Sequence, residues 1–195
     1  KEHEGYISLP QGGFIENLCE MGCHYVETPI DRRGINPITD FKLFRHYLRM
    51  LKDIKPDAAI TYTIKPNVYG GVACRLKKVP YLANVTGLGT SIENKGIVQK
   101  IALSMYRAGV KKAECLFFQN NANKEFMEAK GVSGKSTRLL PGSGVNLTAN
   151  YYRAYPEDQS EIRFLNIQRV MKDKGIEELL GCVESITEKY PFAKF

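Results

Sequence analysis

The chain has 195 residues, of which 43% are hydrophobic and 25% are charged. This composition is that of a globular protein with one large domain, or one domain and part of another, and it excludes a small disulfide-stapled scaffold and a mainly disordered chain. The net charge of +7 at pH 7 calls for an anionic partner, which is nucleic acid, an acidic membrane surface or a phosphorylated substrate.

The five cysteines are odd in number and scattered along the chain, which indicates reduced thiols of a cytosolic protein. The longest apolar runs are far shorter than the roughly 20 residues that a membrane-spanning helix needs, and no signal peptide opens the sequence. The sequence therefore predicts a cytoplasmic protein that does not span a membrane.

Short apolar runs alternate with longer helical patterns, which is typical of βαβ units and a parallel sheet. Strands are expected near residues 6–9, 24–28, 58–63, 81–85, 115–119, 137–140 and 163–167. Helices are expected near 14–21, 41–54, 67–77, 97–112, 121–130 and 175–189. The predicted class is α/β: a Rossmann-like parallel sheet with helices on both faces, followed by the first βα unit of a second domain.

The clearest helix is expected at 41–54, where apolar residues from Phe44 to Leu51 recur at the spacing of one helical face. Thr39 or Asp40 is its expected N-cap. The opposite face of this helix is basic, and we expect it to face solvent.

The helix expected at 97–112 carries Lys100, Arg107 and Lys111 in one row, beside an apolar stripe that runs from Ile97 to Met105. Segment 95–112 has five basic residues and no acidic one. Such a helix is able to lie against anionic lipid headgroups, so the three basic residues are predicted to face a membrane. An ordinary solvent-exposed helix is the alternative.

In a parallel α/β sheet, ligands bind beyond the C-terminal ends of the strands. The loops expected at that edge are rich in glycine, amides and cations, and they include 31–34, 64–67, 86–90, 141–144 and 168–174. Glycine permits close backbone approach, and helix N-termini present free N–H groups to anions. This edge is suited to a phosphorylated ligand.

Established catalytic motifs are missing from the sequence. Gly87 and Gly89 lack the third glycine of a dinucleotide-binding motif, and the phosphate-binding P-loop pattern does not occur. The three histidines belong to no metal-binding or hydrolase motif. The sequence therefore assigns no catalytic residue and predicts no metal site.

Three segments resemble a known family: ITYTIKPNVYGGVACRLKKVPYLANVTGLGT (60–90), FFQNNANKEFMEAKG (117–131) and LLPGSGVNL (139–147). They are similar to the N-terminal acceptor domain of family 4 glycosyltransferases with the GT-B fold. The match is best with the bacterial branch that builds capsule, lipopolysaccharide or polyprenyl-diphosphate-linked glycans. The resemblance implies a chain truncated at both ends, with an acceptor domain (1–147) lacking its first strand, a linker (148–161) and the start of a donor-binding domain (162–195).

The resemblance also implies a function: retaining, metal-independent transfer of a sugar from a nucleotide diphosphate, a UDP-sugar, to a polyprenyl-diphosphate-linked or polysaccharide acceptor. No cofactor is expected beyond this substrate. Arg169 and Lys174 match the positions that hold the donor diphosphate, and Gln168 stands where the family usually has glycine. The expected acceptor-side residues are Arg32, Arg33, Lys65, Asn67, Thr86, Gly87, Leu88, Gly89 and Thr90.

The implied partners are a nucleotide sugar, a lipid-linked glycan acceptor and an anionic membrane surface, with the protein peripheral at the inner face of the membrane. The fragment by itself is expected to be inactive. One alternative is the acceptor-binding and membrane-binding half of a split glycosyltransferase, which needs a separate donor domain. A nucleic-acid-binding module is disfavoured, because aromatic residues do not interleave with the basic rows.

Overall fold

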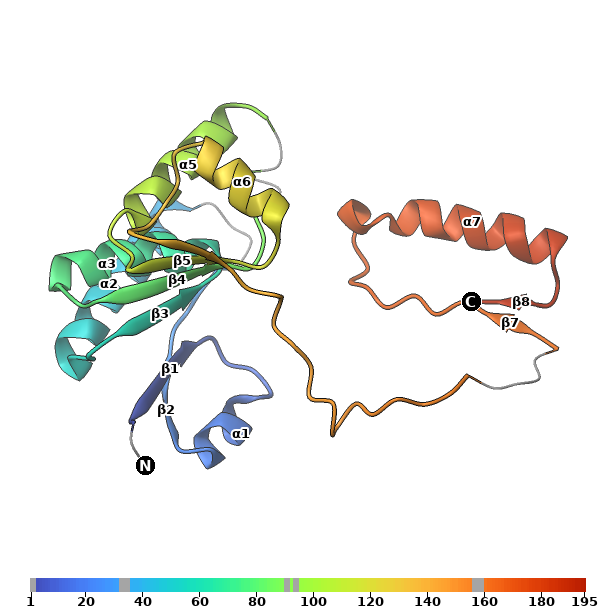
Figure 1. The fold of residues 1–195 in the computed structure, drawn as a ribbon, viewed down its shortest axis with the longest axis horizontal. Helices are drawn as coiled ribbons and strands as arrows, with labels where there is room; N and C mark the ends of the chain where they lie inside the picture. The colour runs from blue at the N-terminus through green and yellow to red at the C-terminus, as the bar shows by residue number, and fades with distance from the viewer. Residues whose placement is uncertain (1–2, 32–35, 90–91, 93–94, 156–159) are drawn as a thin grey trace. The chain divides into compact units, whose positions relative to one another are not determined.

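The structure is a computed structural model that describes residues 3–31, 36–89, 92, 95–155 and 160–195. The chain folds as two compact units, Lys1–Gly144 (unit 1) and Val145–Phe195 (unit 2). Strands and helices alternate along unit 1 (Figure 1). Its strands are β1 (Gly5–Leu9), β2 (Cys23–Glu27), β3 (Ala59–Tyr62), β4 (Tyr81–Val85), β5 (Cys115–Phe118) and β6 (Thr137–Leu139). Its helices are α1 (Ile15–Glu20), α2 (Pro37–Ile54), the π-helix η1 (Pro66–Gly70), α3 (Gly71–Lys77), α5 (Ile97–Val110) and α6 (Asn121–Ala129).

All strand pairs in unit 1 are parallel, which confirms the predicted α/β class. β1 pairs with β2, and β3, β4, β5 and β6 form a four-stranded sheet in that order. In the described residues, the strands thus form two sheets in unit 1, whereas the sequence predicted one. The reason is that β1 and β3 are not hydrogen-bonded to each other.

The helices α3, α5 and α6 lie on one side of the four-stranded sheet (Figure 1), and α2 packs against α3. Right-handed crossovers between consecutive neighbouring strands place their connecting helices on the same face. Alternate side chains follow this arrangement: Thr61 and Ala83 are buried under the helices, whereas Ile60 and Tyr62 are more than half exposed on the other face. The described helices α3, α5 and α6 therefore cover the face of this sheet that carries Thr61 and Ala83.

Helix α2 begins at Pro37, four residues before the predicted start. Asn36 is the N-cap, because its side chain accepts a hydrogen bond from the N–H of Ile38 at 3.0 Å. Proline suits the first helical position, where no backbone donor is needed. The predicted cap residue Asp40 lies inside the helix and is buried.

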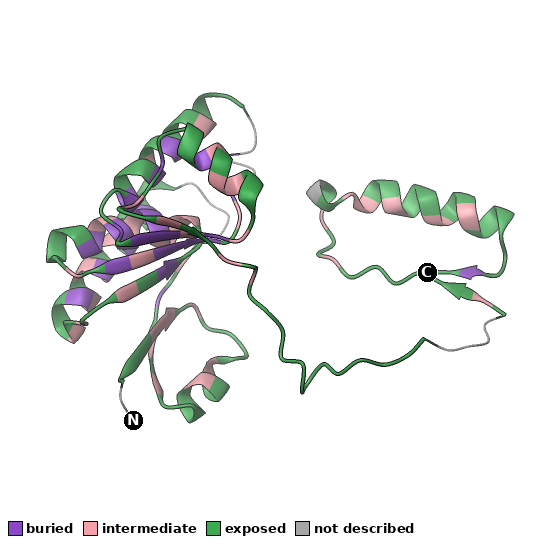
Figure 2. Ribbon diagram, in the orientation of Figure 1, coloured by how far each residue is buried: buried purple, intermediate pink, exposed green. Residues whose placement is uncertain are grey.

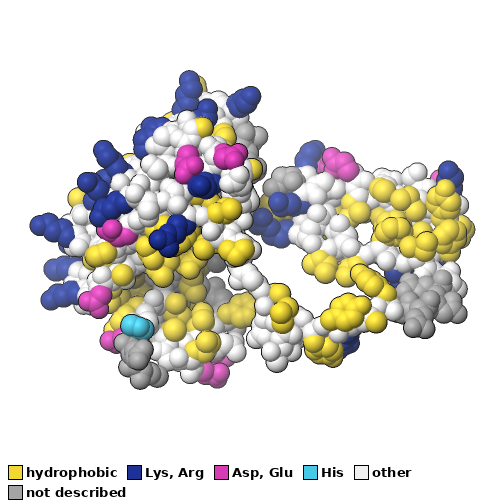
Figure 3. Space-filling model, viewed as in Figure 1, with side chains coloured by type: hydrophobic (Ala, Val, Ile, Leu, Met, Phe, Trp, Pro, Cys, Tyr) yellow, Lys and Arg dark blue, Asp and Glu magenta, His cyan; other side chains and the backbone are white. Residues whose placement is uncertain are grey.

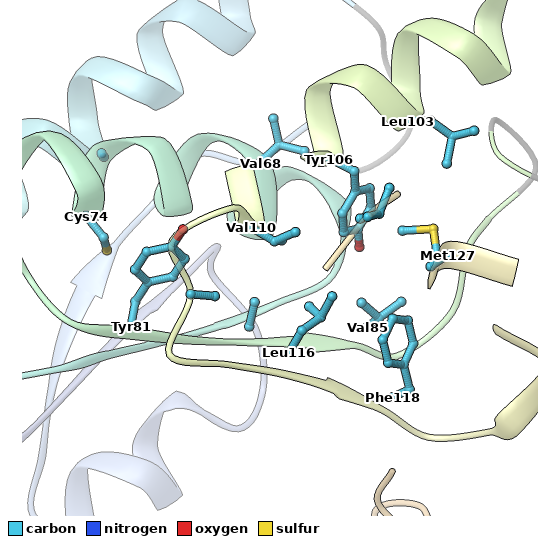
Figure 4. Close-up of a cluster of buried hydrophobic side chains, with 14 of the residues drawn as sticks. Val68, Cys74, Tyr81, Val85, Leu103, Tyr106, Val110, Leu116, Phe118 and Met127 are labelled. Atoms are coloured by element: carbon cyan, nitrogen blue, oxygen red, sulfur yellow. The ribbon is translucent and has the colours of Figure 1, made fainter. Parts of the chain in front are cut away.

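The core of unit 1 lies between the four-stranded sheet and its helices (Figure 2). Tyr106 and Val110 of α5 point toward Leu116 and Phe118 of β5, and Met127 of α6 closes the same cluster (Figure 4). None of these five side chains is exposed. This core fixes the position of the turns at the C-terminal edge of the sheet.

Unit 2 contains β7 (Ile162–Arg163), the 3-10 turn η2 (Lys172–Lys174), α7 (Ile176–Lys189) and β8 (Ala193–Lys194). The predicted strand near 163–167 is wrong beyond Arg163, because β7 ends there and both Leu165 and Ile167 are more than four-fifths exposed. β8, which the sequence did not predict, is the one described strand that pairs with β7. Two short strands offer residues 164–167 no surface on which to bury alternate side chains.

Candidate functional site

The turn that follows β3 combines an uncommon backbone conformation with a π-helix. Thr63 has a φ of 68°, in the left-handed region that β-branched residues rarely adopt, and η1 begins at Pro66. Backbone strain and π-helical turns both gather at functional sites. Because β3 ends here, the turn lies at the C-terminal edge of the sheet, where parallel α/β proteins bind ligands.

Lys65, within this turn, is held by a mostly buried ion pair. Its Nζ donates to Asp40 Oδ1 at 2.6 Å, and the hydroxyl of Tyr69 donates to Asp40 Oδ2 at 2.9 Å. The side chains of Lys65 and Asp40 are 15% and 11% exposed, so salt screens this pair only weakly. Burial, and then the bond to Asp40, raises the pKa of Tyr69 to about 12. Helix α2 therefore orients the ammonium group of Lys65.

Asn67, in η1, is completely buried, and its amide is hydrogen-bonded to protein groups. Its Oδ1 accepts from the Thr61 hydroxyl at 2.7 Å, and its Nδ2 donates to the Asn84 carbonyl at 2.9 Å and to Tyr106 Oη at 3.2 Å. Burial raises the pKa of Tyr106 to about 12, so this hydroxyl stays neutral. These hydrogen bonds connect the turn to β3, β4 and α5. Asn67 therefore does not reach a ligand with its own side chain, and its role is to fix the position of the backbone of the turn.

The loop after β4 contacts the same turn. Thr86 is exposed and Gly87 is half-buried, while Leu88 is buried in the core. Gly89 has a φ of 69°, and a Cβ at this position would lie 3.3 Å from Ile64 Cδ1, so glycine permits the close approach. The structure thus brings together two predicted acceptor-side segments, 64–67 and 86–89. Three other predicted residues lie outside the described part of the chain: Arg32, Arg33 and Thr90.

The predicted membrane-facing residues Lys100, Arg107 and Lys111 are all exposed. Arg107 also has a structural role, because its Nη2 and Nε donate to the carbonyls of Lys130 at 2.6 Å and Gly131 at 3.2 Å. These carbonyls lie at the C-terminal end of α6, where a cation is favourable. The membrane contact itself remains a prediction.

In unit 2, Arg169 and Lys174 are exposed on the loop and the 3-10 turn that precede α7. Gly175, with a φ of 73°, joins this turn to the helix. The first backbone N–H groups of an α-helix have no partner within the helix, and such groups favour an anion. Gln168 is half-buried beside Arg169. Their contact with a donor diphosphate remains a prediction.

A polar cluster that the sequence did not predict joins β1 and β2 to α2. Thr28 is fully buried, and its Oγ1 lies 2.6 Å from Ser8 Oγ and 3.0 Å from His46 Nε2. The imidazole of His46 is half-buried. Burial, and then the nearby Arg49, lowers the pKa of His46. No spacing in the sequence links these residues, so only the fold reveals the cluster.

In the part of the chain that the structure describes, the His, Cys, Asp and Glu side chains form no group of three or more that would hold a metal ion. No helix among the described residues is long and apolar enough to cross a membrane.

Residues 7–120, more than half of the chain, match the model of the glycosyl transferase 4-like family. The chain belongs to this family. The matched region contains the turn after β3, the loop after β4 and the Asp40–Lys65 ion pair. The predicted resemblance to family 4 glycosyltransferases is therefore confirmed.

Two curated relatives are glycosyltransferases. One is the N,N'-diacetylbacillosaminyl-diphospho-undecaprenol alpha-1,3-N-acetylgalactosaminyltransferase of Campylobacter jejuni. It is 25% identical over an alignment of 209 residues, gaps included, and the alignment covers 98% of this chain and 55% of the relative. An uncharacterized glycosyltransferase of Methanocaldococcus jannaschii is 26% identical over 186 residues, which cover 84% of this chain and 45% of the relative. The chain spans about half the length of these relatives. The crystal structure of Acinetobacter baumannii MurG aligns with a TM-score of 0.39 and 14% identity, over 98% of this chain and 75% of MurG.

Proposed function

We propose that the intact protein transfers a sugar, with retention, from a UDP-sugar to a glycan carried on polyprenyl diphosphate at the inner face of the membrane. The observation that carries this proposal is the family match over residues 7–120. A second support is the alignment of 98% of the chain with a relative whose name specifies a diphospho-undecaprenol acceptor.

We assign the acceptor side to residues 1–147 and the donor side to a domain that begins at residue 162, with 148–161 as a linker. The exposed apolar surface of unit 2 supports this assignment. Leu165, Ile167 and Val170 are each more than four-fifths exposed, and Ala193 is the one buried apolar residue among those described in unit 2. Such a surface is expected to be covered by further secondary structure of the same domain.

On the donor side, Arg169 and Lys174 neutralise the charge that builds on the leaving nucleoside diphosphate as the glycosidic bond breaks. Their exposure before the N-terminus of α7 supports this role, because cations and helix N–H groups favour the same anion. Arginine adds two parallel hydrogen bonds to phosphate oxygens, which fixes the orientation of the diphosphate.

On the acceptor side, segments 64–67 and 86–90 form one wall of the site, and Arg32 and Arg33 bind the acceptor diphosphate. The Asp40–Lys65 pair supports this arrangement, because it holds the turn after β3 to α2, and Ile64 of the same turn lies against Gly89 in the loop after β4. A wall whose side chains are already ordered loses little conformational entropy when the acceptor binds.

The test is sugar transfer by the intact protein with Arg169→Ala, with Arg163→Ala as the matched control. Both arginines are exposed in unit 2, and Arg163 pairs with Glu161 at 3.3 Å. We expect Arg169→Ala to lower kcat by about 100-fold or more, with unchanged melting temperature. Arg163→Ala should leave kcat unchanged. Wild-type activity in Arg169→Ala would exclude the diphosphate role.

A further inference from the structure

The Asp40–Lys65 pair differs from an ordinary surface ion pair in its burial and in its position. The side chains of Lys65 and Asp40 are 15% and 11% exposed. A second pair, between Lys135 and Glu114, has side chains that are 55% and 46% exposed. Glu114 directly precedes β5 and Lys135 lies just before β6, so this second pair is at the N-terminal edge of the sheet. Lys65 follows β3 and is at the opposite edge, where parallel α/β proteins bind ligands.

Stability alone does not explain a mostly buried ion pair in this turn. Removing two opposite charges from water costs free energy that their attraction only partly repays, so apolar residues of similar size are often as stable. The neighbouring backbone is in an uncommon conformation as well, because Thr63 has a φ of 68°. Energetically costly groups gather at functional sites. The Asp40–Lys65 pair is therefore a candidate for contact with a ligand.

Both partners keep hydrogen-bonding capacity beyond the contacts that they make. The ammonium group of Lys65 has three N–H donors, and one of them is used on Asp40 Oδ1. Among the described residues, the hydrogen bonds to the Asp40 carboxylate come from Lys65 and from the Tyr69 hydroxyl, and a carboxylate accepts about four. Unused donors and acceptors thus lie side by side. A hydroxyl group fits such a site, because it accepts one hydrogen bond and donates another.

The charges of this pair fit a neutral polar ligand better than a phosphate. Asp40 neutralises Lys65, and Tyr69 adds no charge because its pKa is raised to about 12. A phosphate group close to Lys65 would also lie close to the Asp40 carboxylate, which repels it. Figure 3 shows other Lys and Arg side chains gathered at the surface over α2, α3 and α5. Lys65 differs from these cations, because it is mostly buried and paired.

We propose that Asp40, Lys65 and Tyr69 form a subsite for a hydroxyl group of a neutral sugar in the acceptor. Lys65 Nζ donates to the sugar oxygen, the sugar hydroxyl donates to Asp40, and Tyr69 holds the carboxylate in place. This inference rests on the proposed function and narrows it, because it assigns the turn after β3 to the glycan of the acceptor and not to its diphosphate. The sequence indicates for Asp40 only the role of a helix cap.

The test is binding of small probes to the full chain, measured by ligand-observed NMR titration. The neutral probes are methyl glycosides of glucose, of galactose and of their N-acetylated amino forms, and the anionic probe is inorganic pyrophosphate. We expect at least one glycoside to bind the unaltered chain. Asp40→Asn should weaken this binding about tenfold, because it removes a charged acceptor. The same variant should strengthen pyrophosphate binding about fivefold, because Lys65 is no longer neutralised.

Glu114→Gln is the matched control, because it removes the carboxylate of the ion pair at the opposite edge of the sheet. This control should bind both kinds of probe as the unaltered chain does. Tyr69→Phe keeps both charges of the subsite and provides the test if Asp40→Asn does not fold, as checked by circular dichroism. Tyr69→Phe should weaken glycoside binding about threefold, because it removes the donor to Asp40 Oδ2, and should leave pyrophosphate binding unchanged.

The proposal would be overturned if no glycoside bound the unaltered chain, or if the Asp40 and Tyr69 variants bound glycosides as the Glu114 control does. Parallel loss of both kinds of probe in a folded Asp40→Asn variant would also overturn it, in favour of a purely structural ion pair. The assay involves no donor and no transfer. Sugar transfer by an intact protein whose acceptor side binds no glycoside would refute the subsite alone, whereas glycoside binding without transfer would refute the proposed function alone.

Discussion

Replacement of Gly109 by alanine should destabilise unit 1, because α5 lies directly on η1 at this residue. A Cβ on Gly109 would lie 2.5 Å from the Asn67 carbonyl oxygen and 2.6 Å from Val68 Cα. Both are backbone atoms, so no side-chain rotation relieves the clash. The facing residue is also a glycine, Gly71, whose Cβ would meet the Gly109 carbonyl.

The magnitude follows from the distances. Ordinary carbon contacts lie at about 3.5 Å, so the two helices would have to separate by roughly 1 Å. Overpacking of this kind costs about 3 kcal/mol. Alanine recovers about 1 kcal/mol through its higher helix propensity. The net loss of about 2 kcal/mol corresponds to a fall of roughly 4–8 °C in the melting temperature.

The assay is denaturant and thermal unfolding followed by far-UV circular dichroism. Gly181→Ala in α7 is the matched control, because no atom lies within 4 Å of a Cβ there. This control should leave stability unchanged or raise it by up to about 1 kcal/mol. If Gly109→Ala proves as stable as the unaltered chain, the close packing of α5 on η1, and the placement of Asn67 that depends on it, would be refuted.

Asn67→Ala should lower the free energy of unfolding by about 3 kcal/mol in a denaturant titration, because it leaves buried hydrogen-bonding partners unsatisfied. Native-state alkylation followed by mass spectrometry should label exposed Cys182 and spare Cys74, because burial raises the pKa of the Cys74 thiol to about 11. Burial and the nearby Arg49 lower the pKa of His46 in the folded chain. As the pH falls, His46 is therefore protonated at a higher pH in the unfolded chain than in the folded chain. Stability should therefore fall as the pH drops from about 6.5 through the folded pKa, and His46→Gln should reduce this fall; an equal fall in both proteins would contradict this account.

Local sequence determined the strands and helices of unit 1, because hydrophobic periodicity, caps and turn residues act over a few positions. The predicted helix at 97–112 and the strand at 81–85 correspond closely to α5 and β4. Local pattern also placed the candidate loops at one edge, since every strand of a parallel sheet ends there. The family resemblance likewise came from contiguous segments, and the family match confirms it.

Tertiary structure alone decided which polar groups meet. Lys65 pairs with Asp40, 25 residues earlier, and Asn67 bonds to Tyr106, 39 residues later, so no short-range period encodes either contact. Burial was decided in the same way. The sequence 163–167 has the apolar character of a buried strand, yet Leu165 is exposed because burial requires neighbouring strands, and local composition does not supply them.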